Sequence, residues 1–405
     1  MPTTPPPSPI TLPDTFLWGT STSAHQIEGN NTNSDWWRLE RSAAGLIQEP
    51  SGDAADSYHR WPEDMDLLAD LGFTDYRFSI EWARIEPAPG EYSRAALAHY
   101  RRMVEGALER GLRPMVTLHH FTLPHWFAER GGWRAPDAVD LFARYAQACA
   151  PVLTSGVRHV CTINEPNMVA VMVAAMDAVQ DGEAFPHTGL PLPDEKTSHT
   201  LIAAHRAATA AVKKIDGDIL TGWTVANQAY LAEPGAQETA DAYRHPREDL
   251  FLEAARHDDW IGVQAYTSTR IGPEGPLPVP DGAERTLTGW EFRPEALGIA
   301  LRHTAEVVGP TVQMIVTENG IATDDDSRRT AYLAGALGAL AAAIDDGLNI
   351  GGYLHWSLLD NYEWGSYRPT FGLIAVDKDT FTRTPKPSAA ALGAIGRTRL
   401  LPAAP

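Results

Sequence analysis

The stretch Met314-Ile315-Val316-Thr317-Glu318-Asn319-Gly320 indicates how this chain folds. Three apolar residues that favour β-structure lead into a polar residue, a carboxylate, an amide and a glycine, which predicts a buried strand ending in a sharp turn. In a barrel of parallel strands the active site lies at the carboxyl ends of the strands, so Glu318 is a candidate for chemistry. The alternative is that Glu318 caps the next helix or pairs with an arginine.

A second stretch, His159-Val160-Cys161-Thr162-Ile163-Asn164-Glu165-Pro166-Asn167, has the same form. An apolar run leads to an amide and a carboxylate, and the proline that follows cannot continue the hydrogen-bonded ladder of a central strand. Glu318 therefore has a counterpart in Glu165, at the end of a different strand. Two carboxyl groups that meet at one end of a barrel are the minimum needed to hydrolyse a glycosidic bond.

Short apolar runs alternate with longer segments of helical period from residue 16 onward, which is typical of a parallel sheet covered by helices. Eight such pairs predict an α/β fold, a single-domain (β/α)8 TIM barrel over residues 14–405, after a disordered or extended lead-in at residues 1–13. The expected strands are 16–23, 74–79, 114–118, 159–163, 220–225, 261–266, 314–317 and 352–355. Helices are expected at 61–71, 94–110, 137–153, 198–214, 294–308 and 326–346. Two clusters rich in proline and glycine, 184–193 and 271–278, are expected as loops that shape the substrate entrance.

The composition narrows the class of ligand. With 33 basic and 52 acidic residues the formal net charge is −19, which disfavours binding to nucleic acid or to an anionic membrane surface and fits a neutral small molecule. The two cysteines, Cys149 and Cys161, have no spacing typical of a metal site or a disulfide framework, and both are expected in the core. The N-terminal residues lack the features of a signal peptide and no apolar run approaches the length of a transmembrane helix, so we expect a cytoplasmic protein.

Gln26 lies near the exit of the first expected strand, and its amide can donate to one sugar hydroxyl while accepting from a neighbouring one. Its surroundings, Phe16-Leu17-Trp18-Gly19-Thr20-Ser21-Thr22-Ser23-Ala24-His25-Gln26-Ile27-Glu28-Gly29, strongly resemble glycoside hydrolase family 1, the β-glucosidase and β-glycosidase family. The resemblance recurs in order through nearly the whole chain. It is seen in Tyr76-Arg77-Phe78-Ser79-Ile80, Thr117-Leu118-His119-His120-Phe121-Thr122-Leu123-Pro124, Thr162-Ile163-Asn164-Glu165-Pro166, Thr317-Glu318-Asn319-Gly320 and Trp356-Ser357-Leu358-Leu359-Asp360-Asn361-Tyr362-Glu363-Trp364.

The resemblance implies a retaining β-glycosidase in which Glu165 is the general acid/base and Glu318 the nucleophile. Glu165 must hold a proton near neutral pH to protonate the leaving oxygen, whereas Glu318 must be ionised to attack the anomeric carbon. The charge of Glu318 would keep Glu165 protonated until a covalent glycosyl-enzyme forms. Arg77 matches the family arginine that hydrogen-bonds the nucleophile, and it would lower the pKa of Glu318. Retention requires the two carboxyl groups to lie about 5 to 5.5 Å apart, against roughly 6.5 to 9.5 Å in an inverting enzyme, and we expect the shorter spacing.

Three further residues of the expected site are carried over from the family. Asn164 matches the residue that contacts the sugar 2-hydroxyl, and His120 matches the sugar-binding histidine. Tyr266 aligns with the tyrosine that donates a hydrogen bond to the nucleophile. The strand that carries Tyr266 departs from the family pattern at two positions, because Gln264 is longer than the usual asparagine and Ala265 lacks the usual ring.

The eighth expected strand and the loop after it form a sugar platform by resemblance. Trp356 would be the stacking floor, and Glu363 and Trp364 would hold the outer hydroxyls of the glycone, with a cis peptide bond after Trp356. Residues 364–368 lack the serine, lysine and tyrosine pattern of relatives that cleave 6-phosphoglycosides, although Arg368 is a cation in this stretch. A charged Glu363 would repel a phosphate, so we expect unphosphorylated sugars.

The leading interpretation is a hydrolase for terminal β-D-glucosyl residues, which also takes β-galactosides or β-fucosides, with a small or hydrophobic aglycone and no cofactor. A transglycosidase, in which an acceptor hydroxyl replaces water, would use the same residues. A non-catalytic sugar-binding barrel is the alternative from another class, but both glutamates are present. A metal-dependent barrel hydrolase needs histidines separated by one residue at a strand end plus a carboxylate, and the adjacent pair His119 and His120 would point to opposite faces of a strand.

Overall fold

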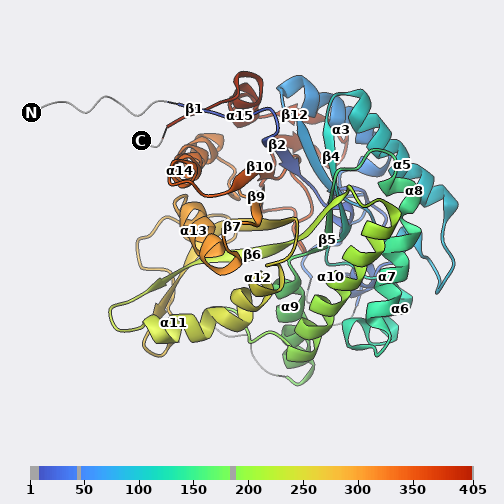
Figure 1. The fold of residues 1–405 in the computed structure, drawn as a ribbon, viewed down its shortest axis with the longest axis horizontal. Helices are drawn as coiled ribbons and strands as arrows, with labels where there is room; N and C mark the ends of the chain where they lie inside the picture. The colour runs from blue at the N-terminus through green and yellow to red at the C-terminus, as the bar shows by residue number, and fades with distance from the viewer. Residues whose placement is uncertain (1–8, 43–46, 183–187, 404–405) are drawn as a thin grey trace, which may run out of the picture.

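Eight parallel strands close into a barrel at the centre of the molecule, in a computed structural model that describes residues 9–42, 47–182 and 188–403 (Figure 1). The sheet order is β6-β5-β4-β3-β2-β10-β9-β7, and β6 pairs with β7 to complete the ring. All eight pairings around the ring are parallel. The strands are β2 (Leu17–Ser21), β3 (Asp75–Ser79), β4 (Arg113–His119), β5 (His159–Asn164), β6 (Leu220–Ala232), β7 (Trp260–Gly272), β9 (Gln313–Glu318) and β10 (Ile350–Trp356). The (β/α)8 barrel predicted from the alternation is confirmed.

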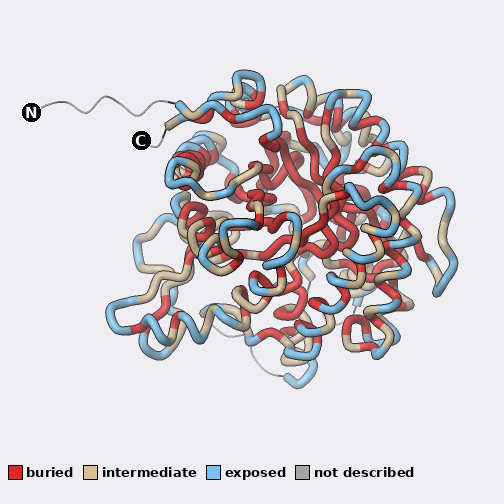
Figure 2. The backbone as a smooth tube through the Cα atoms, in the orientation of Figure 1, coloured by how far each residue is buried: buried red, intermediate tan, exposed pale blue. Residues whose placement is uncertain are grey.

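Helices surround the barrel, and their exposed outer faces enclose the buried strands in Figure 2. The larger ones are α3 (Ser57–Leu71), α5 (Arg94–Glu109), α7 (Ala138–Ala148), α10 (Glu195–Ile215), α13 (Ala296–Val308), α14 (Asp326–Asp345) and α15 (Pro387–Thr398). The helix expected over 137–153 is divided into α7 and the short α8 (Ala150–Leu153), since Pro151 lacks the N–H that an unbroken helix would need. The remaining elements are the 15-residue α9 (Pro166–Gln180) and the shorter α1 (Ala24–Ile27), α2 (Asp35–Leu39), α4 (Trp82–Ile85), α6 (His125–Glu129), η1 (Gly132–Arg134), α11 (Gln237–Arg244), the π-helix η2 (His245–Asp249) and α12 (Leu250–Ala254).

Strands β6 and β7 are longer than the sequence predicts. After a register shift between Asn227 and Ala229 they remain paired as far as Ala232 and Ile271, and β7 then turns back into β8 (Gly275–Pro276). The expectation of a loop over 271–278 is therefore wrong at its start, because glycine and proline here form a two-stranded hairpin instead of irregular chain. The first part of the other cluster, 184–187, lies outside the described residues.

The apolar core has two parts. A continuous cluster fills the space between the sheet and the surrounding helices, and it includes Cys149. A second cluster closes the interior of the barrel below the site, as expected for side chains that point inward from different strands. It consists of Leu17, Met115, Cys161, Trp260, Ile315 and Leu354. The prediction that both cysteines are core residues is confirmed.

The two ends of the described chain meet. Strand β1 (Ile10–Thr11) pairs antiparallel with β13 (Leu400–Leu401), next to α15 in Figure 1. Thus the last residues of the expected lead-in are extended and paired, whereas residues 1–8 lie outside the described part. A small antiparallel pair, β11 (Ile374–Val376) and β12 (Arg383–Pro385), follows β10. Among the described residues no helix combines the length and apolar character needed to span a membrane.

Candidate active site

Glu318 is the last residue of β9, and its carboxylate receives two strong hydrogen bonds. Arg77 Nη1, from β3, donates to Glu318 Oε1 at 2.6 Å, and the Tyr266 hydroxyl, from β7, donates to Glu318 Oε2 at 2.7 Å. The Glu318 side chain is only 6% exposed. Burial raises the pKa of Glu318, while the charge of Arg77 and the hydrogen bond from Tyr266 lower it. Arg77 thus acts in the predicted direction but does not cancel the effect of burial.

Arg77 also fixes the amide of Asn164. The fully buried guanidinium donates from Nη2 to Asn164 Oδ1 at 2.5 Å and from Nε to Thr117 Oγ1 at 3.1 Å. Asn164 Oδ1 accepts two more hydrogen bonds, from Thr224 Oγ1 at 3.0 Å and Gln264 Nε2 at 2.9 Å. Because the amide oxygen is so completely occupied, the amide nitrogen of Asn164 must be the atom that turns away from this network.

Glu165 follows β5 immediately and is held in an unusual backbone conformation. Its φ of 45° and ψ of 60° lie in the left-handed region, which a non-glycine residue rarely adopts, and such residues cluster at functional sites. Its backbone N–H donates to Thr224 O, and Pro166 begins α9. Burial raises the pKa of Glu165 well above its usual value, and the negative charge of Glu318 raises it further. The Glu318 charge thus raises the pKa of Glu165 as predicted, but burial makes the larger contribution.

The two glutamates therefore differ in their partners. The carboxylate of Glu318 has a cation and a hydroxyl donor, whereas no described side chain donates to the carboxyl of Glu165. Hydrogen bonds and a cation favour the ionised form of one group, and burial near an anion favours the protonated form of the other. Such divergence is what an acid and a nucleophile at one site require.

Irregularities in the barrel bring these residues into register. The pairing of β5 with β6 shifts between Cys161 and Asn164, which sets Asn164 opposite Thr224. The pairing of β7 with β9 shifts between Val263 and Gln264, which sets Gln264 opposite Glu318. Irregular strand pairing next to an active site commonly turns a side chain toward it. Both shifts occur at the carboxyl ends of the strands, where the polar residues gather.

Aromatic rings form one wall of the site. The imidazole of His120 stacks on Trp356, with centroids 5.8 Å apart, and on Trp364, with centroids 6.0 Å apart, and Trp364 also stacks on His25. Burial and the nearby charge of Arg77 hold the pKa of His120 well below its usual value, so the ring is neutral. Within the described residues His120 Nδ1 has no hydrogen-bond partner, and such a buried polar atom can bind a hydroxyl. His119 packs against Trp133 on the opposite face of β4, as predicted.

Glu363 and Gln26 lie in a connected set of hydrogen bonds. Trp356 Nε1 donates to Glu363 Oε1 at 3.1 Å, and burial raises the pKa of Glu363 to about 8. The prediction that Glu363 repels a phosphate assumed an ionised carboxyl, but this pKa makes the group largely neutral at pH 7. Both N–H groups of Gln26 donate to the protein, to Asn361 Oδ1 and Tyr362 O, while its Oε1 accepts from a serine. The predicted cis peptide bond between Trp356 and Ser357 is confirmed.

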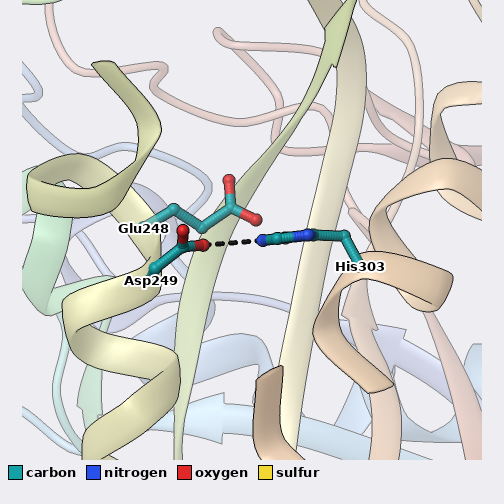
Figure 3. Close-up of side chains that lie close together, drawn as sticks. All are labelled: Glu248, Asp249 and His303. Atoms are coloured by element: carbon teal, nitrogen blue, oxygen red, sulfur yellow. Dashed lines mark hydrogen bonds and ion pairs between the residues drawn. The ribbon is translucent and has the colours of Figure 1, made fainter. Parts of the chain in front are cut away.

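One group of side chains among the described residues has the composition of a metal site. Figure 3 shows Glu248, Asp249 and His303 close together, with Asp249 Oδ1 and His303 Nε2 2.6 Å apart. Protein donors already occupy the carboxylates: Asn227 and the backbone of residue 228 donate to Glu248, and Arg244 pairs with Asp249. A cation in contact with the cluster disfavours a metal ion, so we interpret these residues as a buried ionic network.

Sequence reasoning missed some of the residues that complete the site. Gln264 was only a weak candidate, and Thr117 and Thr224 were not singled out, although all three bond to Arg77 or Asn164. Thr117 lies in a stretch that carries the family resemblance, so its position could have been noticed. Thr224 stands in a strand without any such stretch, and only the pairing of β5 with β6 reveals it.

A closed (β/α)8 barrel with two differently hydrogen-bonded glutamates at the carboxyl ends of its strands is the arrangement that the class of glycoside hydrolases requires. The sequence model of the family described as "Glycosyl hydrolase family 1" matches residues 8–255 and 278–399, and the chain belongs to this family. It is therefore an O-glycosyl hydrolase, as the sequence predicted. The segment 256–277, which contains Gln264 and Tyr266, is not matched.

Relatives cover nearly the whole chain. "Beta-glucosidase A" of Thermotoga maritima is 30% identical in an alignment 434 residues long, which covers 93% of this chain and 96% of the relative. The crystal structure of "beta-glycosidase BGL167" is 42% identical, with a TM-score of 0.87 and coverage of 97% of this chain and 99% of the other. A β-glucosidase from Thermotoga maritima in complex with glucoimidazole is 26% identical, with a TM-score of 0.86 over 96% of this chain and 99% of the other.

Proposed function

We propose that this enzyme hydrolyses terminal, non-reducing β-D-glucosyl residues with retention of configuration, through a covalent glycosyl-enzyme. The observation that carries the proposal is the contrast between Glu318, bound by Arg77 and Tyr266, and Glu165, whose carboxyl receives no hydrogen bond from a described side chain. This contrast suits one carboxylate to attack and the other carboxylic acid to give up a proton.

In the first step Glu318 attacks the anomeric carbon while Glu165 protonates the departing oxygen, so the bond to the aglycone breaks as the glycosyl ester forms. Esterification removes the negative charge of Glu318, and this lowers the pKa of Glu165. Glu165 can then accept a proton from water, which attacks the anomeric carbon, so the bond to Glu318 breaks and the sugar is released. Asn164 and His120 would hold glycone hydroxyls, and Trp356 would pack against the face of the ring.

We propose unphosphorylated β-glucosides as the main substrates, with β-galactosides and β-fucosides using the same pocket. The names of the relatives and the glucoimidazole complex of one of them support a gluco-configured glycone. Residues 364–368 lack the serine, lysine and tyrosine pattern of 6-phosphoglycosidases, and this absence disfavours phosphorylated sugars more than Glu363 does, because burial raises the pKa of Glu363 to about 8. Activity on a 6-phospho-β-glucoside that exceeds activity on the plain glucoside would contradict this preference.

Product stereochemistry tests the proposal directly. Proton NMR during hydrolysis of 4-nitrophenyl β-D-glucoside should show β-glucose first, followed by slow mutarotation to the α-anomer. Initial formation of α-glucose would indicate inversion and contradict both the double displacement and the expected spacing of about 5 to 5.5 Å between the carboxyl groups. The same assay with added methanol measures transfer: if methyl glucoside dominates at low alcohol concentration, the enzyme is mainly a transglycosidase.

A further inference from the structure

A hollow of about 580 Å³ adjoins the candidate site at Glu363. Its volume lies within the range of about 300 to 1,000 Å³ that small-molecule sites occupy. It shares two residues with the expected glycone site and extends beyond them into the loop after β10 and two other loops. The lining side chains used below are Gln48, Leu287, Glu363, Trp364, Ser366 and Arg368.

The position of the hollow places it on the glycone side of the reacting bond. Glu165 follows β5 and must reach the leaving oxygen, so the aglycone belongs to the β5 side of the barrel. In the closed ring β10 lies four strands from β5 in either direction. Thus the loop after β10, which carries Glu363 to Arg368, lies diametrically opposite the leaving group. A ligand in this hollow would extend the sugar at its non-reducing end.

Hydrogen bonds within the protein hold the loop after β10 in place. The backbone N–H of Glu363 donates to Ser366 O at 2.8 Å, and the N–H of Arg368 donates to Ser366 Oγ at 3.0 Å. Glu49 anchors the loop from outside, since its Oε2 accepts from Ser366 Oγ and from the backbone N–H of Tyr367. A wall that is already ordered costs little conformational entropy when a ligand binds.

The chemistry of the lining suits a carbohydrate. Gln48 supplies an amide, and Leu287 offers apolar surface to the C–H face of a ring. Ser366 Oγ donates to Glu49 and accepts from the backbone of Arg368, so it can still accept one hydrogen bond from a ligand. Within the described residues the guanidinium of Arg368 forms no ion pair, whereas nearby Lys378 is paired with Glu49. The exposed arginine is therefore available as a hydrogen-bond donor. A lone phosphate would leave most of this space unfilled.

We propose that the hollow binds a second pyranosyl unit, linked to the primary hydroxyl of the glycone, so that the enzyme also cleaves β-diglycosides and releases an intact disaccharide. This inference rests on the proposed function, because it uses the same two carboxyl groups. The anomeric bond between the disaccharide and the aglycone breaks, and water supplies the hydroxyl of the disaccharide and the proton of the alcohol. The primary hydroxyl is favoured because its exocyclic carbon lets the second ring leave the plane of the first.

The test compares 4-nitrophenyl β-D-glucoside with 4-nitrophenyl 6-O-α-D-glucopyranosyl-β-D-glucoside. A β-glycosidase cannot remove the outer α-linked unit, so any nitrophenol released from the second substrate must be accompanied by isomaltose. We expect equal amounts of nitrophenol and isomaltose from the start, with kcat/KM within about tenfold of that for the glucoside. Hydrolysis of the glucoside alone would overturn this inference and leave the proposed function intact. Failure on both substrates would overturn both.

Variants test whether the second sugar unit binds in the hollow. Arg368→Trp should fill the mouth of the hollow and lower kcat/KM for the disaccharide substrate by about tenfold or more, with little change for the glucoside. Arg94→Trp, at the exposed start of α5, is the matched control and should leave kcat/KM unchanged for both substrates. The inference would be overturned if Arg368→Trp lowered kcat/KM equally for both substrates, or if it lowered kcat/KM for neither. Faster cleavage of a 6-phospho-β-glucoside than of the disaccharide substrate would also overturn it, and would assign the hollow to an anion.

Discussion

Strands β9 and β7 both contribute to the surroundings of the Glu318 carboxyl group, although the family model matches the residues of β9 and not those of β7. β9 supplies Glu318 from a stretch that the family model matches, and β7 supplies the Tyr266 hydroxyl, 2.7 Å away, from a segment that it does not match. The register shift in β7 also sets Gln264 opposite Glu318. The proposed nucleophile thus lies in a matched stretch, whereas one of the two side chains that donate to it lies in a segment outside the match.

The largest effect should come from the strand with the family sequence. Glu318→Gln removes the nucleophile while keeping the volume of the side chain, and kcat for 4-nitrophenyl β-D-glucoside should fall about 10⁴-fold or more. Steady-state kinetics and circular dichroism provide the measurement. Glu248→Gln is the matched control, a buried glutamate whose pKa burial raises to about 7, and it should retain most of the activity. Undiminished turnover in Glu318→Gln would contradict the assignment.

Glu165→Gln should have the next largest effect, and its size should depend on the leaving group. General acid catalysis contributes about 10² to 10⁴-fold, so hydrolysis of alkyl β-glucosides should fall in that range. A 2,4-dinitrophenyl leaving group needs no proton, and its release in the first step should slow far less. If both substrates lose activity equally, Glu165 does not act as the acid.

Tyr266→Phe tests the strand that the family model does not match. Loss of one donor to a reacting carboxylate should lower kcat/KM by about 10 to 10²-fold. Glu318 must be ionised to attack, and the Tyr266 hydroxyl lowers its pKa. Without this hydrogen bond the pKa of Glu318 rises, so the acidic limb of the pH profile of kcat/KM should move to higher pH. Tyr145→Phe, which removes a buried hydroxyl bonded to Leu118 O, should leave the profile unchanged.

The smallest effect should come from replacing Gln264 with asparagine, the residue usual in the family at this position. Gln264→Asn shortens the side chain and should break the 2.9 Å hydrogen bond to Asn164 Oδ1. A single hydrogen bond of this kind is worth about 1 kcal/mol, so kcat/KM should fall roughly fivefold. Comparison of 2-deoxyglucoside with glucoside would show whether the loss passes through the sugar 2-hydroxyl. A gain in activity would indicate that glutamine is a defect in this site instead of an adaptation.

Much of the fold could be predicted because it is encoded locally. Runs such as 314–316 are apolar on both faces and lead into polar and turn residues, which is what a strand buried inside a barrel requires. The arm of β6 and β7 could not be predicted, since the residues beyond 225 and 266 mix polar and apolar side chains and pair mainly with each other. Local propensity is weak there, and the pairing of the two strands decides the structure.

By itself, the sequence determined the eight strands, the two glutamates at strand ends and the family, because each can be recognised from short stretches of consecutive residues. Only the tertiary structure decided how those glutamates are tuned. Arg77 and Glu318 are 241 residues apart, and the closing of the ring brings their side chains to 2.6 Å. Burial, which changes the pKa of both carboxyl groups, is likewise a property of the assembled barrel. Chemistry at this site therefore depends on residue identities that the chain carries and on an environment that exists only after folding.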